Sequence, residues 1–483
     1  MKSVSSKENP LYMRLGASPY IIMALALLLL ISPLVIKSSF DLAGKEPYLI
    51  DRLSSQFLAQ GIEQTDSLSF SGRPYIYPFG TVVIASLIKK LTSHNTALIY
   101  LPIILGVLSS LLFYSLIRLL SNTRTALISS LIFIISPSFI YTFAYLKEFT
   151  LPFFLILLAS YLLLTKKLTP IAYALLAITP FFGIEHAIIS LLILFVFFNK
   201  EQKPATLISY LLIIILLLVT YFPLLMSNGF PAIADFEEHN PAFKIFSDFG
   251  SRFGISLFII FLAVFGLKEL WKEKYTHIKV YLSLLVILIL LVIKPSFIIY
   301  ATLLLAPLAA LGIHYLLNIH WESKIIKELT IFILILGLIF STASYLNSYK
   351  TSQPSKAIIS SLSFLEQNTP EDSVILSHYS YGIWINSLAL RKNIMDEQFL
   401  YAPKLNKRYA DAQEIFSSRN LEKTKALLSM YAVTHIYITP EMKQGLTWDA
   451  EEQGLLFILK FSKDDFTQIY NTNGIEIWEI KRL

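Results

Sequence analysis

Long apolar runs recur along this chain, and they limit its fold more than any other feature. A run of about 20 mostly apolar residues is long enough to cross the hydrocarbon core of a bilayer as an α-helix. Of the 483 residues, 55% are hydrophobic and 15% are charged, whereas a soluble domain carries about 25% charged residues. The sequence therefore predicts a polytopic α-helical membrane protein with about eleven transmembrane helices, at 18–38, 96–117, 125–144, 149–165, 168–183, 185–199, 206–226, 253–271, 279–293, 295–318 and 326–346.

The basic residues predict how these helices are oriented. Lys and Arg gather in the cytoplasmic loops of membrane proteins. If the N-terminus is cytoplasmic, every inside segment is basic, and an odd number of spans places everything after residue 346 outside. The net charge of +7 lies in these short clusters, so we expect no nucleic-acid partner. The chain has no cysteine, which excludes disulfides and thiolate metal sites.

Composition changes abruptly near residue 350. The sequence predicts a transmembrane domain over 1–349, with outside loops at 39–94 and 227–252, and an extracytoplasmic α/β domain over 350–483. Helical spacing is found at 355–368 and 419–432, whereas β-branched and aromatic alternation marks strands at 372–378, 433–439 and 474–481.

The stretch "GKEPYLIDRLSSQFLAQG" at 44–61 directly follows the first apolar run. Pro47 and Gly61 bracket a short helix. Its residues Leu49, Ile50, Leu53, Phe57 and Leu58 share one side, the spacing of a helix that lies flat in the membrane interface. Glu46 stands just before this helix, where a carboxylate serves either as an N-terminal cap or as part of a site.

Two further outside segments supply carboxylates. One is the turn with Lys147 and Glu148; the other is the loop with Glu237 and Glu238. Each is also compatible with an ordinary solvated turn. Together with Glu46 they form an oxygen-rich set that suits Mn²⁺ or Mg²⁺, cations that leave coordination positions open for phosphate oxygens. Glu185 and His186 lie near a helix end, facing either a cavity or water.

Four segments, in order, resemble the catalytic subunit of oligosaccharyltransferase. They are "EPYLIDR" with the following "TDSLSFSGRPYIYPFGT", then "SPSFIYTFAYLKEFTLPFF", "IADFEEHNPAFKIFSDFG" and "HYSYGIWINSLALRKNIMDEQF". The resemblance identifies the chain with the GT-C superfamily of membrane glycosyltransferases, which use polyprenyl-linked sugar donors. It implies a multi-pass protein of a prokaryotic plasma membrane, whose partners are the bilayer, a polyprenyl-phosphate-linked donor and a protein or glycan acceptor.

The resemblance also implies roles for individual residues. It gives Glu46 and Glu148 as catalytic residues and, with Glu237 or Glu238, as ligands of Mn²⁺ or Mg²⁺. Arg52 matches a basic residue that follows the first acid, and Tyr381 and Gly382 match an acceptor-binding segment. Beyond the resemblance, the predicted topology places Arg52, Arg73, Lys147 and Arg252 outside, where they are candidates for binding the donor phosphate; an interfacial anchor is the alternative for Arg73.

The chain also departs from the family pattern. Leu146 stands where the first acid of a paired motif is expected, and His378, Tyr379 and Ser380 replace Trp, Trp and Asp. These departures predict a paralogue with a different acceptor. Three alternatives stay open: a transferase that moves a single sugar, of the O-mannosyl or aminoarabinose type; a non-catalytic relative; and a lipid or sugar transporter.

Overall fold

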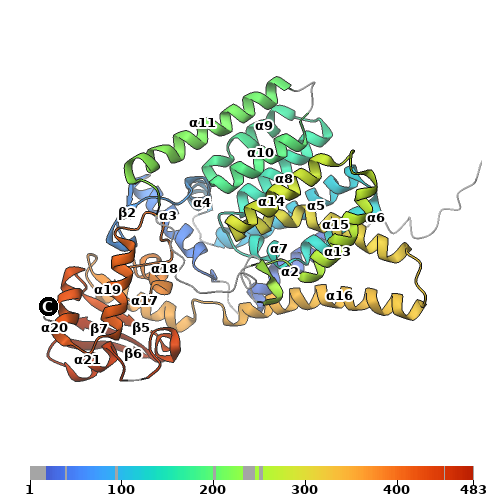
Figure 1. Ribbon diagram of the computed structural model, residues 1–483. Coiled ribbons are helices and arrows are strands. Elements are labelled where there is room, and N and C mark those ends of the chain that lie inside the picture. Colours follow the sequence, from blue (N-terminus) through green and yellow to red (C-terminus); the bar gives the residue numbers. More distant parts are fainter. Residues whose placement is uncertain are drawn as a thin grey trace, which may run out of the picture. The chain divides into compact units, whose positions relative to one another are not determined.

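The chain forms two compact units in a computed structural model (Figure 1). The described residues are 18–37, 41–61, 63–92, 96–198, 203–231, 245–249, 254–450 and 452–481. The first unit comprises the described residues within Met1–Asp41, His94–Thr220 and Glu237–Thr351. The second comprises those within Leu42–Ser93, Tyr221–Phe236 and Ser352–Leu483. The first loop thus folds with the C-terminal residues, whereas the change of composition near residue 350 predicts that it belongs to the transmembrane domain.

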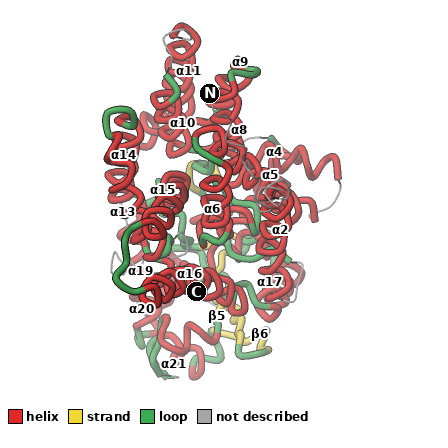
Figure 2. The backbone as a smooth tube through the Cα atoms, turned by 90° about the vertical axis from the view of Figure 1, so that its right-hand side faces the viewer, coloured by secondary structure: helices red, strands yellow, loops and turns green. Residues whose placement is uncertain are grey.

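Helices account for most of the backbone, and strands are confined to a small part of it (Figure 2). Each of the eleven predicted apolar segments contains an α-helix, which confirms their secondary structure. These helices are α2 (Ser18–Lys37), α5 (Thr96–Leu120), α6 (Thr123–Ile134) with α7 (Pro137–Phe143), α8 (Thr150–Thr165), α9 (Thr169–Ala177), α10 (Ile184–Val196), α11 (Lys203–Asn228), α13 (Leu257–Leu270), α14 (Ile278–Ile293), α15 (Ile298–Asn318) and α16 (Lys324–Asn347).

The number of membrane spans is a separate question from the number of helices. Among the described residues, five helices are long and apolar enough to cross a membrane. Helices α6 and α7 together would make a sixth, with a bend of 66°. Pro137 explains the break, because proline lacks the N–H that a continuous helix needs at this position. Several other apolar helices are shorter, with 10–17 residues. The structure supports several spans, and the predicted number of eleven is not confirmed.

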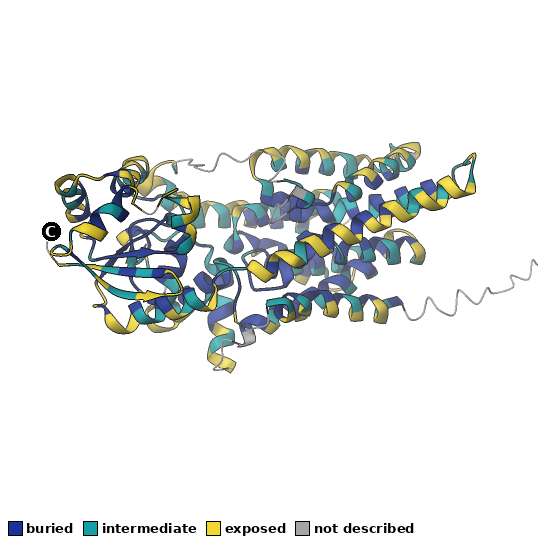
Figure 3. Ribbon diagram, turned by 90° about the horizontal axis from the view of Figure 1, so that it is seen from below, coloured by how far each residue is buried: buried dark blue, intermediate teal, exposed yellow. Residues whose placement is uncertain are grey.

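Exposed residues line the outer faces of the long helices (Figure 3), and many of them are large and apolar. Leu218 and Val219 of α11 and Phe332 and Ile339 of α16 are each more than half exposed. Contiguous exposed apolar surface of this kind is unfavourable in water and suits contact with lipid. The first unit therefore has the surface of a membrane protein.

Two glycines let α13 and α15 approach each other closely. A Cβ atom added to Gly266 would stand 1.8 Å from the carbonyl oxygen of Leu308, and one added to Gly312 would stand 1.9 Å from that of Leu262. No side chain fits at either position. Small residues at membrane helix contacts permit such close backbone packing.

The second unit contains a five-stranded mixed sheet with the order β4-β3-β5-β7-β6. Strand β3 pairs in parallel with β4 and β5, and β7 pairs antiparallel with β5 and β6. The three predicted strands and both predicted helices of this region are present. Its elements are α17 (Lys356–Asn368), β3 (Val374–Leu376), β4 (Lys392–Asn393), α19 (Leu405–Ser417), α20 (Leu421–Met430), β5 (His435–Ile438), α21 (Leu455–Phe461), β6 (Phe466–Thr472) and β7 (Ile475–Ile480).

The second unit also contains the helix predicted from the 44–61 stretch, α3 (Glu46–Gln60). Pro47 lies in its first turn, and Gly61 ends it with a φ of 79°. Protein covers part of the apolar side, because Leu49, Ile50 and Leu53 are buried and α3 packs on α4 (Phe79–Thr92), whereas Leu58 is 45% exposed. That this helix lies flat in the membrane interface stays a prediction. Glu46 is the first residue of the helix, and Lys45 takes the capping position.

Candidate functional site

Glu46 begins α3 with its carboxylate only partly covered. The hydroxyl of Tyr77 donates a hydrogen bond to Oε1 of Glu46 over 3.1 Å. The first N–H groups of a helix have no partners within the helix, so they favour a negative charge at this position. The helix start and Tyr77 together hold this carboxylate while leaving it accessible. Sequence reasoning missed Tyr77, although it lies in the aromatic-rich turn "RPYIYPFG" that the resemblance includes.

Arg52, predicted to bind phosphate, is paired inside the second unit. Its two terminal nitrogens donate to the two carboxylate oxygens of Asp66, over 3.0 and 2.7 Å. The side chains are 3% and 4% exposed. Burial alone would raise the pKa of Asp66, but the charge and hydrogen bonds of Arg52, with help from Arg73, hold that pKa below its usual value. This pair fixes α3 to β1 (Thr65–Asp66).

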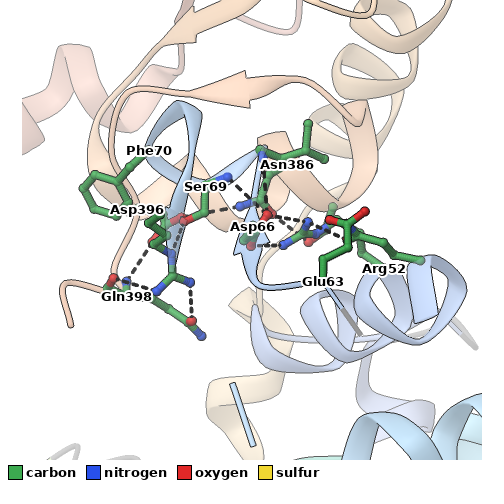
Figure 4. A network of polar contacts seen from close by, with 12 residues as sticks. Arg52, Glu63, Asp66, Ser69, Phe70, Asn386, Asp396 and Gln398 are labelled. Atoms are coloured by element: carbon green, nitrogen blue, oxygen red, sulfur yellow. Dashed lines mark hydrogen bonds and ion pairs between the residues drawn. The ribbon is translucent and has the colours of Figure 1, made fainter. Parts of the chain in front are cut away.

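Arg73 is also buried and takes part in a network of polar contacts, in which Figure 4 labels Ser69, Asp396 and Gln398. Its Nε donates to the hydroxyl of Ser69 over 2.6 Å, and one terminal nitrogen donates to the side-chain oxygen of Gln398 over 2.7 Å. Ser69 in turn donates to Asp396, which also accepts from the side chain of Asn386. Residues from the first loop and from the C-terminal region thus form one buried polar network. The guanidinium groups of Arg52 and Arg73 are engaged in this network.

Lys147 and Glu148 lie in the turn between α7 and α8 of the first unit. The ammonium group of Lys147 donates to the carbonyl oxygen of Tyr141 over 2.7 Å and lies above the Tyr141 ring. Its backbone N–H donates to the hydroxyl of Thr150. Lys147 is 7% exposed, whereas Glu148 is partly exposed just before α8. The neighbouring lysine therefore supports the turn that presents Glu148.

A polar cluster of the first unit lies near Glu148. Nδ1 of His186 is 2.7 Å from the hydroxyl of Tyr300, and His186 is 1% exposed. The carboxylates of Glu148 and Glu185 both act electrostatically on that hydroxyl. Glu185 also forms an ion pair with Lys294. The sequence left two placements open for His186, facing a cavity or facing water. Because its side chain is buried, the placement facing water is excluded. Polar groups in an apolar surrounding need hydrogen-bond partners, and Tyr300 provides one here.

Tyr381 and Gly382, predicted to bind the acceptor, are both buried. The hydroxyl of Tyr381 donates to Glu441 over 3.1 Å, and burial raises the pKa of Tyr381 above its usual value. A Cβ added to Gly382 would stand 2.2 Å from the carbonyl oxygen of Met395. The glycine is therefore required by packing between the segment that follows β3 and the one that follows β4. Acceptor binding by Tyr381 and Gly382 stays a prediction.

His378 stands at the start of the same segment. Its Nδ1 is 2.8 Å from the hydroxyl of Ser380. Burial and the nearby charge of Lys45 lower the pKa of His378 to about 4. The imidazole is thus neutral at physiological pH. A neutral imidazole and a hydroxyl replace the carboxylate that the family pattern would place here.

The predicted metal ligands are only partly described. Glu237, Glu238 and Arg252 lie outside the described residues, and Glu46 and Glu148 belong to different units. Within the described ranges, no group of three or more His, Asp or Glu side chains is arranged to hold a metal ion. The described residues therefore do not by themselves provide a metal site.

Comparison with known proteins gives a match in structure. No family model and no curated protein sequence matches the chain. The oligosaccharyltransferase of Archaeoglobus fulgidus, in its apo form, has a TM-score of 0.62 at 15% identity, over 88% of this chain and 70% of that one. ArnT of Cupriavidus metallidurans bound to undecaprenyl phosphate has a TM-score of 0.52 at 11% identity, over 95% and 97%.

The arabinofuranosyltransferase AftD from mycobacteria has a TM-score of 0.60 at 14% identity, over 96% of this chain and 40% of that one. Similarity at this level of identity establishes the fold. The chain therefore has the fold of the GT-C glycosyltransferases, and the resemblance to oligosaccharyltransferase that its motifs indicate is confirmed in the structure.

Proposed function

We propose that the chain is an integral-membrane glycosyltransferase that moves a sugar or oligosaccharide from a polyprenyl-phosphate or -diphosphate donor to an acceptor on the extracytoplasmic face. The observation that carries the proposal is the GT-C fold combined with an accessible carboxylate, Glu46, at the first turn of α3. Structures with this fold include complexes with dolichol-phosphate and with undecaprenyl phosphate. They also include one with a tethered acceptor peptide. These complexes support a lipid-phosphate donor.

Glu46 would act on the acceptor nucleophile. Its carboxylate accepts the proton of the attacking group while the new bond to the anomeric carbon forms. The bond between that carbon and the donor phosphate oxygen breaks, and the lipid phosphate leaves with the electron pair. The hydrogen bond from Tyr77 fixes one oxygen of Glu46. Glu148 is proposed as a second catalytic carboxylate, supported by its partial exposure in a turn whose other residues are buried.

A divalent cation, Mn²⁺ or Mg²⁺, is part of the proposal because the predicted outside carboxylates form an oxygen-rich set and because the resemblance implies a metal. It would neutralise charge on the departing phosphate, with ligands among Glu46, Glu148, Glu237 and Glu238. Arg52 and Arg73 are engaged with Asp66 and Gln398. Their contribution to donor binding is therefore proposed to be indirect, through the shape of the first loop.

Transfer of a single sugar is a second candidate. The chain spans 97% of ArnT, which is described in complex with undecaprenyl phosphate, but 70% of the oligosaccharyltransferase. The larger covered share of ArnT is the observation that favours this candidate. Both candidates share the role proposed for Glu46.

The test uses the purified full-length chain in lipid nanodiscs with Mn²⁺ and radiolabelled polyprenyl-phosphate and -diphosphate sugars. Label transferred to a candidate peptide or glycan is the readout. Replacement of a general base costs about 10²–10⁴-fold in rate, so Glu46→Gln should lower transfer to that extent. Glu371→Gln, an exposed residue of the same unit, should transfer at the wild-type rate. Equal rates in both variants, or movement of the donor across sealed vesicles without a covalent product, would refute the proposal.

A further inference from the structure

The two residues directly before Glu46 are held by the C-terminal part of the second unit. The N–H of Gly44 donates to the carbonyl oxygen of Gln353 over 2.8 Å. The indole N–H of Trp384 donates to the carbonyl oxygen of Gly44 over 3.1 Å. Gly44 has a φ of 84°, which other residues adopt only with strain. The backbone N–H and the carbonyl oxygen of Gly44 thus both form hydrogen bonds with residues more than 300 positions away in the sequence.

Lys45 is held on two sides. Its ammonium group forms an ion pair with Glu397 and lies 5.3 Å from the centre of the Trp384 ring. The lysine side chain is 14% exposed and that of Glu397 is 27% exposed, so the pair is largely shielded. Its charge also contributes to the low pKa of His378. Trp384 therefore contacts both Gly44 and Lys45, once through its N–H and once through its ring face.

The residues that hold Gly44 and Lys45 are themselves fixed. Trp384 is 4% exposed and packs against Tyr381, with ring centres 5.8 Å apart. Glu397 follows Asp396, which is 1% exposed and belongs to the buried network with Ser69. A side chain that is itself held by packing and hydrogen bonds can hold a second group in one orientation.

We propose that Trp384 and Glu397 are positioning residues for Glu46. Through Gly44 and Lys45 they fix the backbone where α3 begins and thereby the direction of the Glu46 carboxylate. The inference rests on the proposed function, since it names what holds the proposed base. A carboxylate displaced by about 1 Å can lose about 10²-fold in rate. Loss of the contacts that Trp384 and Glu397 make with Gly44 and Lys45 should therefore lower turnover and leave substrate binding largely intact.

Glu397→Gln removes the ion pair with little change in shape, and Trp384→Phe removes the N–H donor but keeps a ring. Each should lower kcat about 10- to 100-fold with less than a twofold change in KM. The charge exchange Lys45→Glu with Glu397→Lys should recover most of the lost turnover, and Glu371→Gln is the matched control. A rise in KM at unchanged kcat, or no recovery in the exchanged pair, would overturn the inference.

Hydrogen exchange separates this inference from the proposed function. The amide of Leu49 donates to the carbonyl oxygen of Lys45, so it reports on the start of α3 without any turnover. It should exchange at least about tenfold faster in Glu397→Gln than in Glu371→Gln. If the Leu49 amide exchanges at the same rate in both variants, the positioning role of Glu397 is refuted, whether or not the protein transfers sugar. Absence of transfer by the wild-type chain, with the exchange difference present, would refute the proposed function instead.

Discussion

Arg52 and Asp66 form a bidentate ion pair, and both side chains are almost completely buried. Removing one partner leaves the other charged group buried without its counterion. The loss of one member of such a pair costs about 3–5 kcal/mol. Asp66→Asn should therefore destabilise the second unit by roughly that amount, measured by chemical denaturation of the full chain in detergent. Asp372→Asn, at an exposed position of the same unit, should change stability by less than about 0.5 kcal/mol.

The same pair predicts sensitivity to acid. The folded-state pKa of Asp66 lies below its ordinary value of 3.8, so the ionised carboxylate stabilises the fold above that value. This contribution is lost as the pH falls from 3.8 through the lower folded pKa. Thermal midpoints measured between pH 5 and pH 2 should fall more steeply in the wild type than in Asp66→Asn. Parallel curves for the two proteins would contradict the prediction.

His378 predicts a second pH dependence at a higher window. Its pKa is about 4 in the folded protein, against 6.5 for an unperturbed histidine. The folded state therefore prefers neutral imidazole, and stability is lost as the pH falls from 6.5 towards 4. In His378→Asn, the thermal midpoint should depend less on pH between 6.5 and 4 than it does in the wild type. Equal slopes in His378→Asn and the wild type would contradict the prediction.

Close packing of α13 and α15 gives a prediction for the first unit. Gly312→Val would push side-chain atoms into the carbonyl oxygen of Leu262, which a Cβ alone would approach to 1.9 Å. Overpacking of this kind costs about 1–3 kcal/mol or more. The variant should show a lower thermal midpoint and less folded protein after extraction. Val264→Leu, at a position of α13 that is 60% exposed, should behave like the wild type.

The proposed cation can be tested without turnover. If Glu46 is a ligand, Mn²⁺ should raise the thermal midpoint of metal-free wild-type protein, because a ligand that binds the folded state stabilises it. The shift should be much smaller in Glu46→Gln and undiminished in Glu371→Gln. A shift of equal size in Glu46→Gln would remove that residue from the metal site.

Local signals in the sequence predicted local structure well. Pro47 and Gly61 gave the bounds of α3 within one residue, and β-branched alternation found β3, β5 and β7. Periodicity shows which side of a helix is apolar, but it does not show what covers that side. Leu49 and Ile50 were therefore assigned to the membrane interface, whereas the structure covers them with protein.

The buried network was beyond sequence reasoning for a different reason. Ser69 and Asp396 are 327 positions apart, and Lys45 and Glu397 are 352 apart. No spacing rule links residues at such separations. For the same reason the sequence predicts Arg52 and Arg73 as unpaired cations of an outside loop, available to bind the donor phosphate. Their partners Asp66 and Gln398 become evident only when the first loop is seen folded on the C-terminal residues.

The long separation between Lys45 and Glu397 has a consequence for synthesis of the chain. The ribosome makes Gly44 and Lys45 early and their holding residues only after most of the hydrophobic helices have emerged. Until then the start of α3 lacks the contacts that orient its first carboxylate. The backbone at the start of α3 can thus be fixed only when translation of the chain is nearly complete.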